Sequence, residues 1–326
     1  MTISVPQTPP GVVVVGSINM DLVVRSTRLP APGETLIGDS LSEIPGGKGA
    51  NQAVGAARLG ADVSLIGRLG DDGFGDTLRR ALGVEGIQLD GVELTRECCS
   101  GVAIIGVEDS GQNCITVVPG ANGRLTPDDV QRQALAIAQA DVLLLQLEVP
   151  IQTVLAAIEL AKTNDVLTIL DPAPAIRDYP PELLSVDVVC PNESEAALLT
   201  GIEITTTESA LRAAEKLQQL GARQVVITLG DKGAVFRDAS GNSGHLEPFS
   251  VTTVDTTAAG DAFAAALGIR LAEGGSLQDA GRFACAAGAV AASRKGAQPG
   301  MPSRADVNAL VRVARTFSGP GEPFYS

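Results

Sequence analysis

TPDDVQRQALAIAQADVLLLQLEVPIQTVLAAIELAKTNDVLTILDPAPA, residues 126–175, alternates two helical patterns with two short apolar runs. Thr126 followed by Pro127 is typical of a helix start, because a hydroxyl residue caps the helix and proline needs no N–H at the first helical position. Each helical pattern leads into an apolar run of strand length. Strands that alternate with helices are typical of βαβ units. We therefore predict an α/β fold with a mostly parallel central sheet and helices on both faces.

The same alternation extends in both directions. Upstream, GVVVVG at 11–16 is a β-branched strand, and ANQAVGAARLGA at 50–61 is a helix. Downstream, the strands VDVVCPN and QVVITLG flank the helices ESEAALLTG and ESALRAAEKLQQLG. Ligands of such sheets bind at the carboxyl ends of the strands. The residues that follow each strand are therefore the candidates for chemistry.

Two stretches, 17–47 and 91–120, have no helical period and carry β-type alternation with glycine and proline turns. Insertions of this length are often functional lids. We assign them to a small β-sheet lid over the binding edge. The α/β core then comprises 11–16, 48–90 and 121–317, and we expect flexible tails at 1–10 and 318–326.

Composition excludes several classes of protein. The formal net charge of the 326 residues is −14 with no basic run, which argues against nucleic acid or an anionic membrane surface as a partner. The apolar runs are too short to span a bilayer, and the first residues do not resemble a signal peptide. Five cysteines without a C-x-x-C spacing argue against a disulfide framework and favour a reducing, cytoplasmic location.

The segment DTTAAGDAFAAAL, residues 255–267, places a carboxylate at the mouth of an apolar helix. Ala258, Ala259 and Gly260 are small, and the first N–H groups of a helix favour anions. Asp261 is then either a helix cap or a base held next to a phosphate site. The only histidine, His245, lies in a stretch that we interpret as a surface loop. If the protein is an enzyme, its base is therefore expected to be a carboxylate.

Polar residues follow several of the predicted strands. Together with the glycines between them, they are Asn19, Asp21, Gly47, Lys48, Asn51, Glu148, Asn192, Glu195, Gly230, Asp231 and Gly233. Taken singly, each is explained as a turn or a cap; Asn192 and Glu195, for example, have the spacing of a capping box. Their shared position favours a site for a polyhydroxylated ligand, since Asp and Asn can hold hydroxyl groups in pairs. Neither the P-loop nor the dinucleotide fingerprint is present.

The motifs GSINMD, PGGKGANQAVGAARLGADVSLIGRLGDDGFG, PNESEAALLTG, TLGDKG, VDTTAAGDAF and RKGAQP resemble, in this order, those of the ribokinase-like sugar kinases, the phosphofructokinase B family. The resemblance covers about residues 11–315. It implies ATP-dependent phosphorylation of D-ribose at the 5-hydroxyl. Asp261 would be the general base, and the backbone of Ala258, Ala259 and Gly260 the anion hole.

The resemblance also implies the remaining roles. The sugar-binding residues would be Asn19, Asp21, Gly47, Lys48, Asn51, Glu148 and Asp261. The ATP-binding residues would be Asn192, Thr228, Gly230, Asp231, Gly233 and Gly260, with Glu195 linked to the Mg²⁺ that accompanies ATP. An activating K⁺ would be held by Asp255, Thr257, Ala292, Lys295 and Ala297. Cys285 stands where many family members carry His or Asn beside the adenine.

Other functions remain open at this point. The acceptor could be a nucleoside, a ketohexose or a keto-sugar acid. Nucleobases commonly stack on aromatic rings, and residues 1–178 hold a single aromatic residue, Phe74, so a bare sugar is favoured over a nucleoside. A non-catalytic sugar sensor would be expected to lose the base or the anion hole, and both are present. We further expect a homodimer formed through the lid, because a small sheet leaves an apolar face and edges uncovered.

Overall fold

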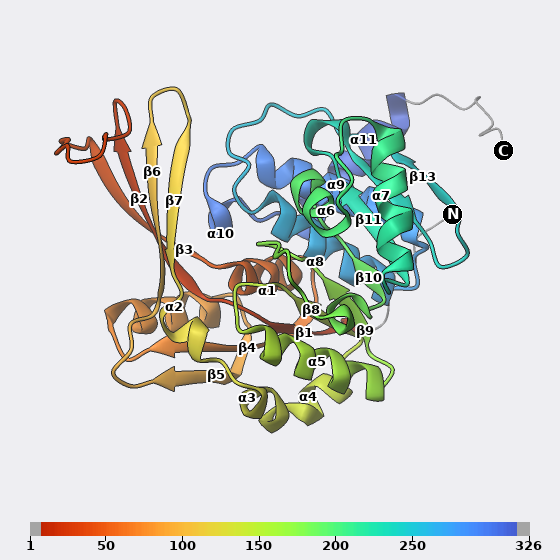
Figure 1. Ribbon diagram of the computed structural model, residues 1–326, viewed down its shortest axis with the longest axis horizontal. Coiled ribbons are helices and arrows are strands. Elements are labelled where there is room, and N and C mark those ends of the chain that lie inside the picture. Colours follow the sequence, from red (N-terminus) through yellow and green to blue (C-terminus); the bar gives the residue numbers. More distant parts are fainter. Residues whose placement is uncertain (1–7, 318–326) are drawn as a thin grey trace.

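The computed structural model describes residues 8–317, so most of the predicted tails, 1–7 and 318–326, lie outside the described residues. The main sheet has nine strands in the order β13-β12-β11-β10-β9-β8-β1-β4-β5 (Figure 1). All pairs from β11 to β5 are parallel, whereas β12 and β13 add an antiparallel edge. The strands are β1 Gly11–Val15, β4 Asp62–Gly70, β5 Gln88–Thr95, β8 Val142–Leu145, β9 Leu167–Leu170, β10 Val188–Val189, β11 Gln224–Thr228, β12 Ala234–Arg237 and β13 Ser243–Leu246.

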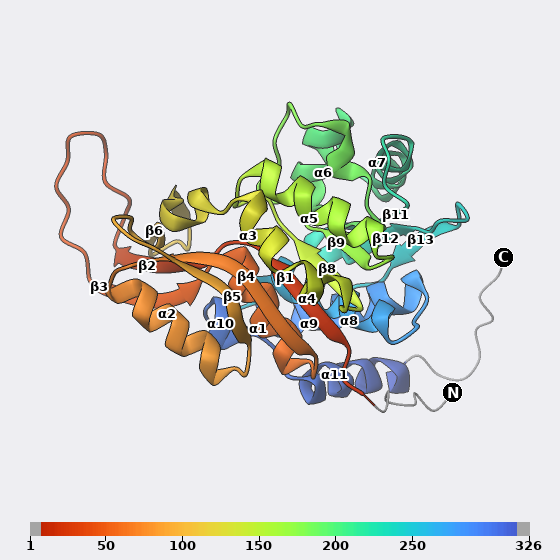
Figure 2. The same cartoon turned by 90° about the horizontal axis from the view of Figure 1, so that it is seen from below.

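Helices cover both faces of this sheet, as Figure 2 shows, which confirms the predicted fold class. On one face lie α3 Pro127–Arg132, α4 Ala134–Ala138, α5 Ile151–Thr163, α6 Glu193–Thr200 and α7 Thr207–Gln219. On the other lie α1 Lys48–Arg58, α2 Gly73–Val84, α8 Ala259–Ala272, α9 Leu277–Ala292, α10 Ala297–Gly300 and α11 Arg304–Phe317. Successive strand residues alternate between the two cores: Val12 packs on one side, Val13 on the other. None of the helices within 8–317 is long and apolar enough to cross a membrane.

A separate four-stranded sheet in the order β3-β2-β6-β7 projects from this domain (Figure 1). Its strands are β2 Asn19–Ser26, β3 Ser40–Gly46, β6 Gly101–Glu108 and β7 Asn113–Val118. They fall within the two stretches that we assigned to a lid. One boundary is wrong, because residues 91–95 belong to β5 and pair in parallel with β4 of the main sheet.

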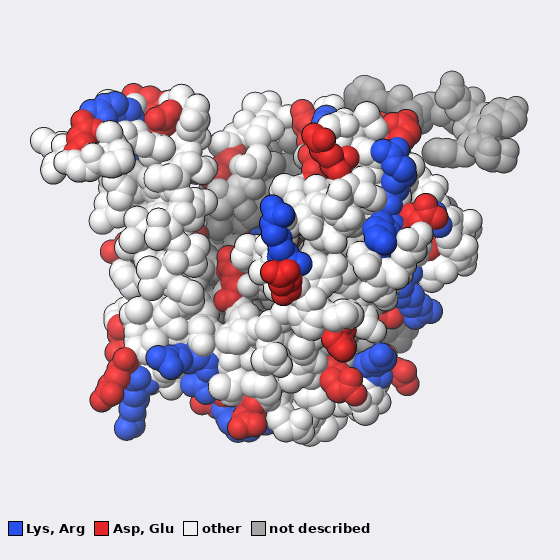
Figure 3. Space-filling view, in the orientation of Figure 1, with Lys and Arg blue, Asp and Glu red and all other residues white. Residues whose placement is uncertain are grey.

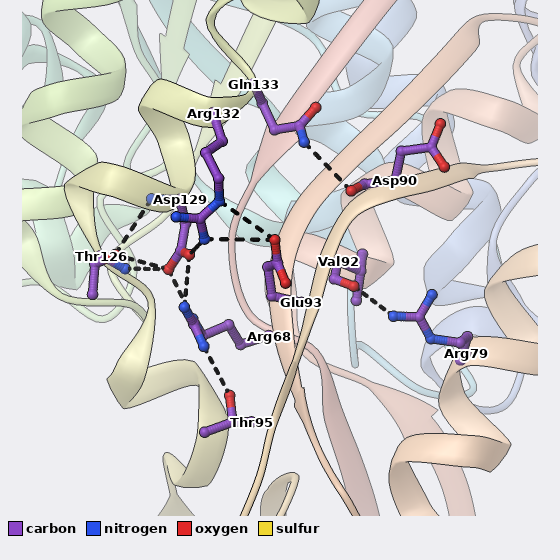
Figure 4. Close-up of polar contacts among 10 residues, drawn as sticks. All are labelled: Arg68, Arg79, Asp90, Val92, Glu93, Thr95, Thr126, Asp129, Arg132 and Gln133. Atoms are coloured by element: carbon purple, nitrogen blue, oxygen red, sulfur yellow. Dashed lines mark hydrogen bonds and ion pairs between the residues drawn. The ribbon is translucent and has the colours of Figure 1, made fainter.

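A network of ion pairs around a buried carboxylate links β5 to β4 and α3 of the main domain (Figure 4). Asp129 of α3 accepts hydrogen bonds from Arg68 of β4 at 2.7 and 2.6 Å and is also paired with Arg132. Burial opposes ionisation of Asp129, but the bonds from Arg68 and Thr126 outweigh it and lower the carboxyl pKa. Arg132 also forms an ion pair with Glu93 of β5, so the edge strand belongs to the same network.

Two further expectations differ from the structure. The helix predicted from residue 127 is broken at Gln133, whose φ of −102° and ψ of 18° separate α3 from α4. His245 lies in the edge strand β13 rather than in a loop, opposite Val235 of β12. Its stretch is rich in turn residues because the tight β12–β13 turn immediately precedes it.

Candidate active site

Helix α1 crosses the end of β1 with backbone in contact with backbone. A Cβ on Gly49 would lie 2.6 Å from the carbonyl carbon of Gly16, and a Cβ on Gly16 would lie 2.7 Å from the Cα of Gly49. Only glycine at both positions allows this approach. Further along α1, Gly55 faces Ala265 of α8, so these two helices also pack closely. Their proximity brings the polar residues at the start of α1 to the start of α8.

Asp261 sits in the first turn of α8 and does not cap it. The N-cap residue is Ala258, and no side-chain cap bond is present. The Asp261 carboxylate, 3% exposed, instead turns toward α1. Its Oδ2 accepts from Asn51 Nδ2 at 2.9 Å, and its Oδ1 accepts from Gln52 Nε2 at 3.3 Å. Its side chain is therefore held for a purpose other than capping.

The backbone before Asp261 presents unpaired N–H groups. Ala258 has φ 60° and ψ 12°, a left-handed conformation that is costly for alanine and that is found preferentially at functional sites. The N–H of Ala259 donates to Thr256 O at 3.2 Å. Within residues 8–317, no acceptor is recorded for the N–H groups of Gly260 and Asp261. A left-handed residue followed by a helix start forms a concave anion site.

Asp21 is a buried carboxylate without a hydrogen-bond donor among the described residues. It is 8% exposed and lies against the backbone of Gly46, where a Cβ would come within 2.3 Å of its Oδ2. Burial, and then the negative charges of Glu148 and Asp261, raise the pKa of Asp21 to about 7. Such a carboxylate is costly for the free protein and is positioned to accept hydrogen bonds from a ligand.

Asn19 is held in a fixed orientation by Asn122, which follows the lid strand β7. Asn122 Nδ2 donates to Asn19 Oδ1 at 2.7 Å and to Ile18 O at 3.1 Å, and Asn122 Oδ1 accepts from Ile18 N at 2.9 Å. Because the Asn19 oxygen already accepts a bond from Asn122, the N–H groups of the Asn19 amide are left to donate to a ligand.

Glu148 follows β8 and joins the loop after β1 to the start of α1. Ser17 Oγ donates to Glu148 Oε2 at 2.5 Å, and the Lys48 N–H donates to the same oxygen at 3.2 Å. Gly47, the residue before α1, has φ 88°, and a Cβ there would lie 2.6 Å from Asn19 N. The glycine therefore permits the turn that places Lys48, Glu148 and Asn19 side by side.

The Lys48 ammonium lies between two carboxylates. Its Nζ is 4.0 Å from Asp261 Oδ1 and 3.9 Å from Asp171 Oδ2. Burial alone would lower the pKa of Lys48, but Asp261, Asp171, Glu148 and Glu195 together raise it, so the side chain carries its charge. Beside it, Asn51 Oδ1 is buried without a partner among the described residues. A hydroxyl donor from a ligand would satisfy this oxygen.

The residues predicted for a monovalent cation lie together at the loop before α8. Asp255 Oδ1 accepts from the Thr257 N–H at 3.0 Å, and Asp255 Oδ2 accepts from the Gly296 N–H at 2.9 Å, between Lys295 and Ala297. The Asp255 N–H donates to Ala292 O at 3.1 Å. Carboxylate and carbonyl oxygens are ligands that suit a hard cation. The residues thus fit such an ion by their chemistry.

The predicted nucleotide residues gather at the ends of β10 and β11. Asn192 and Glu195 form the capping box of α6, with reciprocal bonds of 2.9 Å. Asn192 also bridges to Thr228. Gly230 (φ 60°) and Gly233 (φ 86°) flank the turn that carries Asp231, and a Cβ on Gly233 would lie 2.0 Å from Leu246 O.

Beyond this turn, Arg282 of α9 lies over the ring of Phe249 at 5.7 Å, and Cys285 is half-buried one turn further along. Within 8–317, no cluster of three or more His, Cys, Asp or Glu residues has the arrangement of a metal site.

Figure 3 shows a hollow between the projecting sheet and the body of the main domain, with acidic side chains inside it. The structure brings the predicted sugar residues together around Lys48, Glu148 and Asp261. Charge interactions of Glu195 with Lys48 and Asp171 link the nucleotide side to this group.

Four residues of this region, Ser17, Gln52, Asn122 and Asp171, were not among the site residues predicted from the sequence. Asp171 directly follows β9, so the strand-end criterion would have found it. Gln52 sits inside α1 and gives no signal of its own, because glutamine is common in helices.

The sequence and the fold are similar to those of known carbohydrate kinases. Residues 10–304 match the model of the pfkB family of carbohydrate kinases. The chain is 43% identical to a ribokinase of Haemophilus influenzae over 89% of this chain and 95% of the relative. It is 36% identical to a deoxyribokinase of Salmonella typhimurium, covering 93% and 99%. The structure of Arabidopsis thaliana ribokinase complexed with ribose and ATP superimposes with a TM-score of 0.87 at 36% identity, covering 94% of this chain and 99% of that one. The chain belongs to the pfkB family of carbohydrate kinases.

Proposed function

We propose that the protein transfers the γ-phosphoryl group of ATP to the 5-hydroxyl of D-ribose. The observation that carries the proposal is Asp261, a buried carboxylate whose two oxygens are held by amides of α1 at the start of α8, next to unpaired N–H groups. A base beside an anion site is the arrangement that phosphoryl transfer from an alcohol requires.

The sugar is held by the buried polar groups around Asp261. Asp21 and the free Asn51 oxygen accept hydrogen bonds from hydroxyl groups, while Lys48 and the oriented Asn19 amide donate to hydroxyl oxygens. Two accepting and two donating groups around a small polyol fix its orientation. The sugar 5-hydroxyl then faces Asp261.

In the reaction, the hydroxyl oxygen attacks the γ-phosphorus and its bond to the phosphate forms as the bond to the ADP oxygen breaks. Asp261 accepts the hydroxyl proton. The backbone of Ala258, Ala259 and Gly260 forms the anion hole that stabilises the charge on the transferring phosphoryl oxygens, and the Gly260 N–H, unpaired among the described residues, is available to them. Closure of the lid sheet over the sugar excludes water and so suppresses ATP hydrolysis.

Two cations belong to this proposal. Mg²⁺ bound with ATP neutralises phosphate charge, and Glu195 would face it through water or phosphate. K⁺ would be held by the loop of Asp255 and Thr257 and the turn from Ala292 to Ala297. Because Thr257 directly precedes Ala258, this loop fixes the orientation of the anion-hole N–H groups.

Ribose is favoured over a nucleoside by the lack of an aromatic surface. Phe74, the sole aromatic residue of 1–178, starts α2 and packs against the core. The second candidate acceptor is 2-deoxyribose, which the similarity to a deoxyribokinase favours.

An ADP-release assay across ribose, 2-deoxyribose, fructose, adenosine and cytidine tests the proposal. We expect the highest kcat/KM with ribose and a product phosphorylated at the 5-position. A higher kcat/KM with any other acceptor would overturn the assignment of ribose, and ADP release from none would overturn the assignment of a kinase.

A further inference from the structure

A second buried carboxylate, Asp171, lies next to the proposed base and has no role in the mechanism above. It directly follows β9 and is 6% exposed. Gln52 Nε2 donates to Asp171 Oδ2 at 3.0 Å and to Asp261 Oδ1 at 3.3 Å, so one amide connects the two carboxylates. Lys48 Nζ is almost equidistant from the same two oxygens, at 3.9 and 4.0 Å.

The orientation of the Gln52 amide is fixed by a hydrogen bond from a second glutamine. Gln146, which directly follows β8, donates from Nε2 to Gln52 Oε1 at 2.5 Å. Both glutamines are fully buried. Because the Gln52 oxygen is occupied, its NH₂ group must face the carboxylates. The arrangement is therefore built from four elements, α1, α8 and the ends of β8 and β9, rather than from one exposed cluster.

At 3.9 and 4.0 Å, the Lys48 ammonium makes a close ion pair with neither Asp171 nor Asp261. Asp171 attracts Lys48 away from Asp261 and leaves the Asp261 carboxylate accessible to a sugar hydroxyl. A neutral residue at 171 would leave Asp261 as the nearest anion, and Lys48 would close onto it. A general base must come within about 2.6–3.2 Å of the proton that it abstracts, and a closed Lys48–Asp261 pair would cover it.

We propose that Asp171 is a positioning residue: its negative charge holds the Lys48 ammonium off Asp261 and keeps the base free for the sugar hydroxyl. The inference rests on the proposed function, since it assigns Asp261 as base.

The charged state of Asp171 depends on its surroundings. Burial raises its pKa above the usual range for an aspartate; Asp261, Glu195 and Glu148 add to this effect, and Lys48 opposes it. The Cys190 thiol also lies within the field of Asp171. Acid should therefore neutralise Asp171 in the wild-type protein and reproduce the effect of a neutral substitution.

The test is the ratio of kcat for wild type to kcat for Asp171→Asn, measured with saturating ribose and ATP from pH 5.5 to 9. Asparagine keeps an acceptor oxygen for Gln52 and removes the charge, while its NH₂ group takes the place of the second carboxylate oxygen. We expect a ratio of about tenfold or more at pH 8.5 that falls toward one at pH 5.5. The titration of Asp21 is common to both proteins and largely cancels in the ratio.

Asp171→Ser, a second neutral variant of different shape, should give the same convergence if charge is the cause. Asp187→Asn is the matched control. This carboxylate precedes β10 at the opposite end of the sheet and is paired with Arg223 at 3.2 Å, so its ratio should stay near one.

A ratio that is constant with pH would show a structural role and overturn the proposal, as would a ratio near one at every pH or failure of both neutral variants to fold. Wild-type activity is measured first. A wild type inactive on ribose contradicts the proposed function, whereas an active wild type with a flat ratio contradicts only the role of Asp171.

Discussion

Asp21 illustrates, at the scale of one residue, a conflict between stability and binding. Its carboxyl pKa of about 7 lies well above the ordinary value for an aspartate, because the ionised form is buried without a donor. A raised acid pKa means that the group contributes stability below about pH 4 and that this contribution is lost as pH rises through 7. The free protein therefore carries the cost of Asp21 at neutral and alkaline pH.

We predict that Asp21→Asn raises the free energy of unfolding at pH 8 by about 1–3 kcal/mol, a gain that disappears toward pH 4. The same variant should lose ribose binding, because the amide presents donors where the sugar needs an acceptor. Urea unfolding at several pH values measures the first effect and calorimetric titration the second. The control is Asp39→Asn, at an exposed aspartate of the lid, which should leave the free energy of unfolding unchanged. If the stability gain of Asp21→Asn did not depend on pH, burial of the Asp21 charge would not be its cause.

At the scale of elements, the crossing of β1 and α1 determines where the site forms. We predict that Gly49→Ala lowers the free energy of unfolding by about 1–3 kcal/mol and lowers kcat, because its Cβ meets the backbone of Gly16 at 2.6 Å. The matched control is Gly83→Ala in α2, which meets nothing within 4 Å and should stabilise the protein by about 0.5–1 kcal/mol. Equal unfolding midpoints for the two variants would rule out the close crossing.

The loop before α8 gives a second prediction at this scale. Asp255 joins this loop to the Gly296 turn and lies two residues before Thr257. We expect kcat with ribose to be severalfold higher in potassium than in sodium buffer, because a bound cation would order the loop that carries the anion hole. Equal rates in sodium, potassium and caesium, at constant ionic strength, would count against the cation site.

The same elements show how far the sequence predicts the structure. Alternating helix and strand patterns predict the main sheet, since each has a distinct period. They did not predict the break at Gln133 or the assignment of 91–95, which depends on the pairing of β5 with β4. Within the site, the residues after the strands and the start of the predicted helix indicated Lys48 and Asp261, and the family motifs gave their roles. Gln52 and Asn122 act through bonds to residues distant in the chain.

At the scale of the whole molecule, the lid exposes an apolar face. Strand register places Val24, Leu41 and Ile104 on the face opposite Asp21, and they are 36%, 62% and 47% exposed. We predict a homodimer that buries this face. Leu41→Asp combined with Ile104→Asp should give a monomer in sedimentation, whereas Leu135→Asp, at an exposed leucine of α4, should not. If the wild-type protein sediments as a monomer at micromolar concentration, the prediction of a homodimer is wrong.

The central claim is that Asp261 is the base of a ribose kinase, and Asp261→Asn tests it most directly. The structure removes the alternative of a cap, since α8 begins without one. We predict that the variant still binds ribose and ATP in calorimetric titrations and that its kcat falls by at least about 10²-fold, because asparagine cannot accept the hydroxyl proton. The control is Asp279→Asn, at an aspartate in the first turn of α9, which should keep the wild-type kcat. A folded Asp261→Asn protein that turns over within a few-fold of wild type would contradict the mechanism.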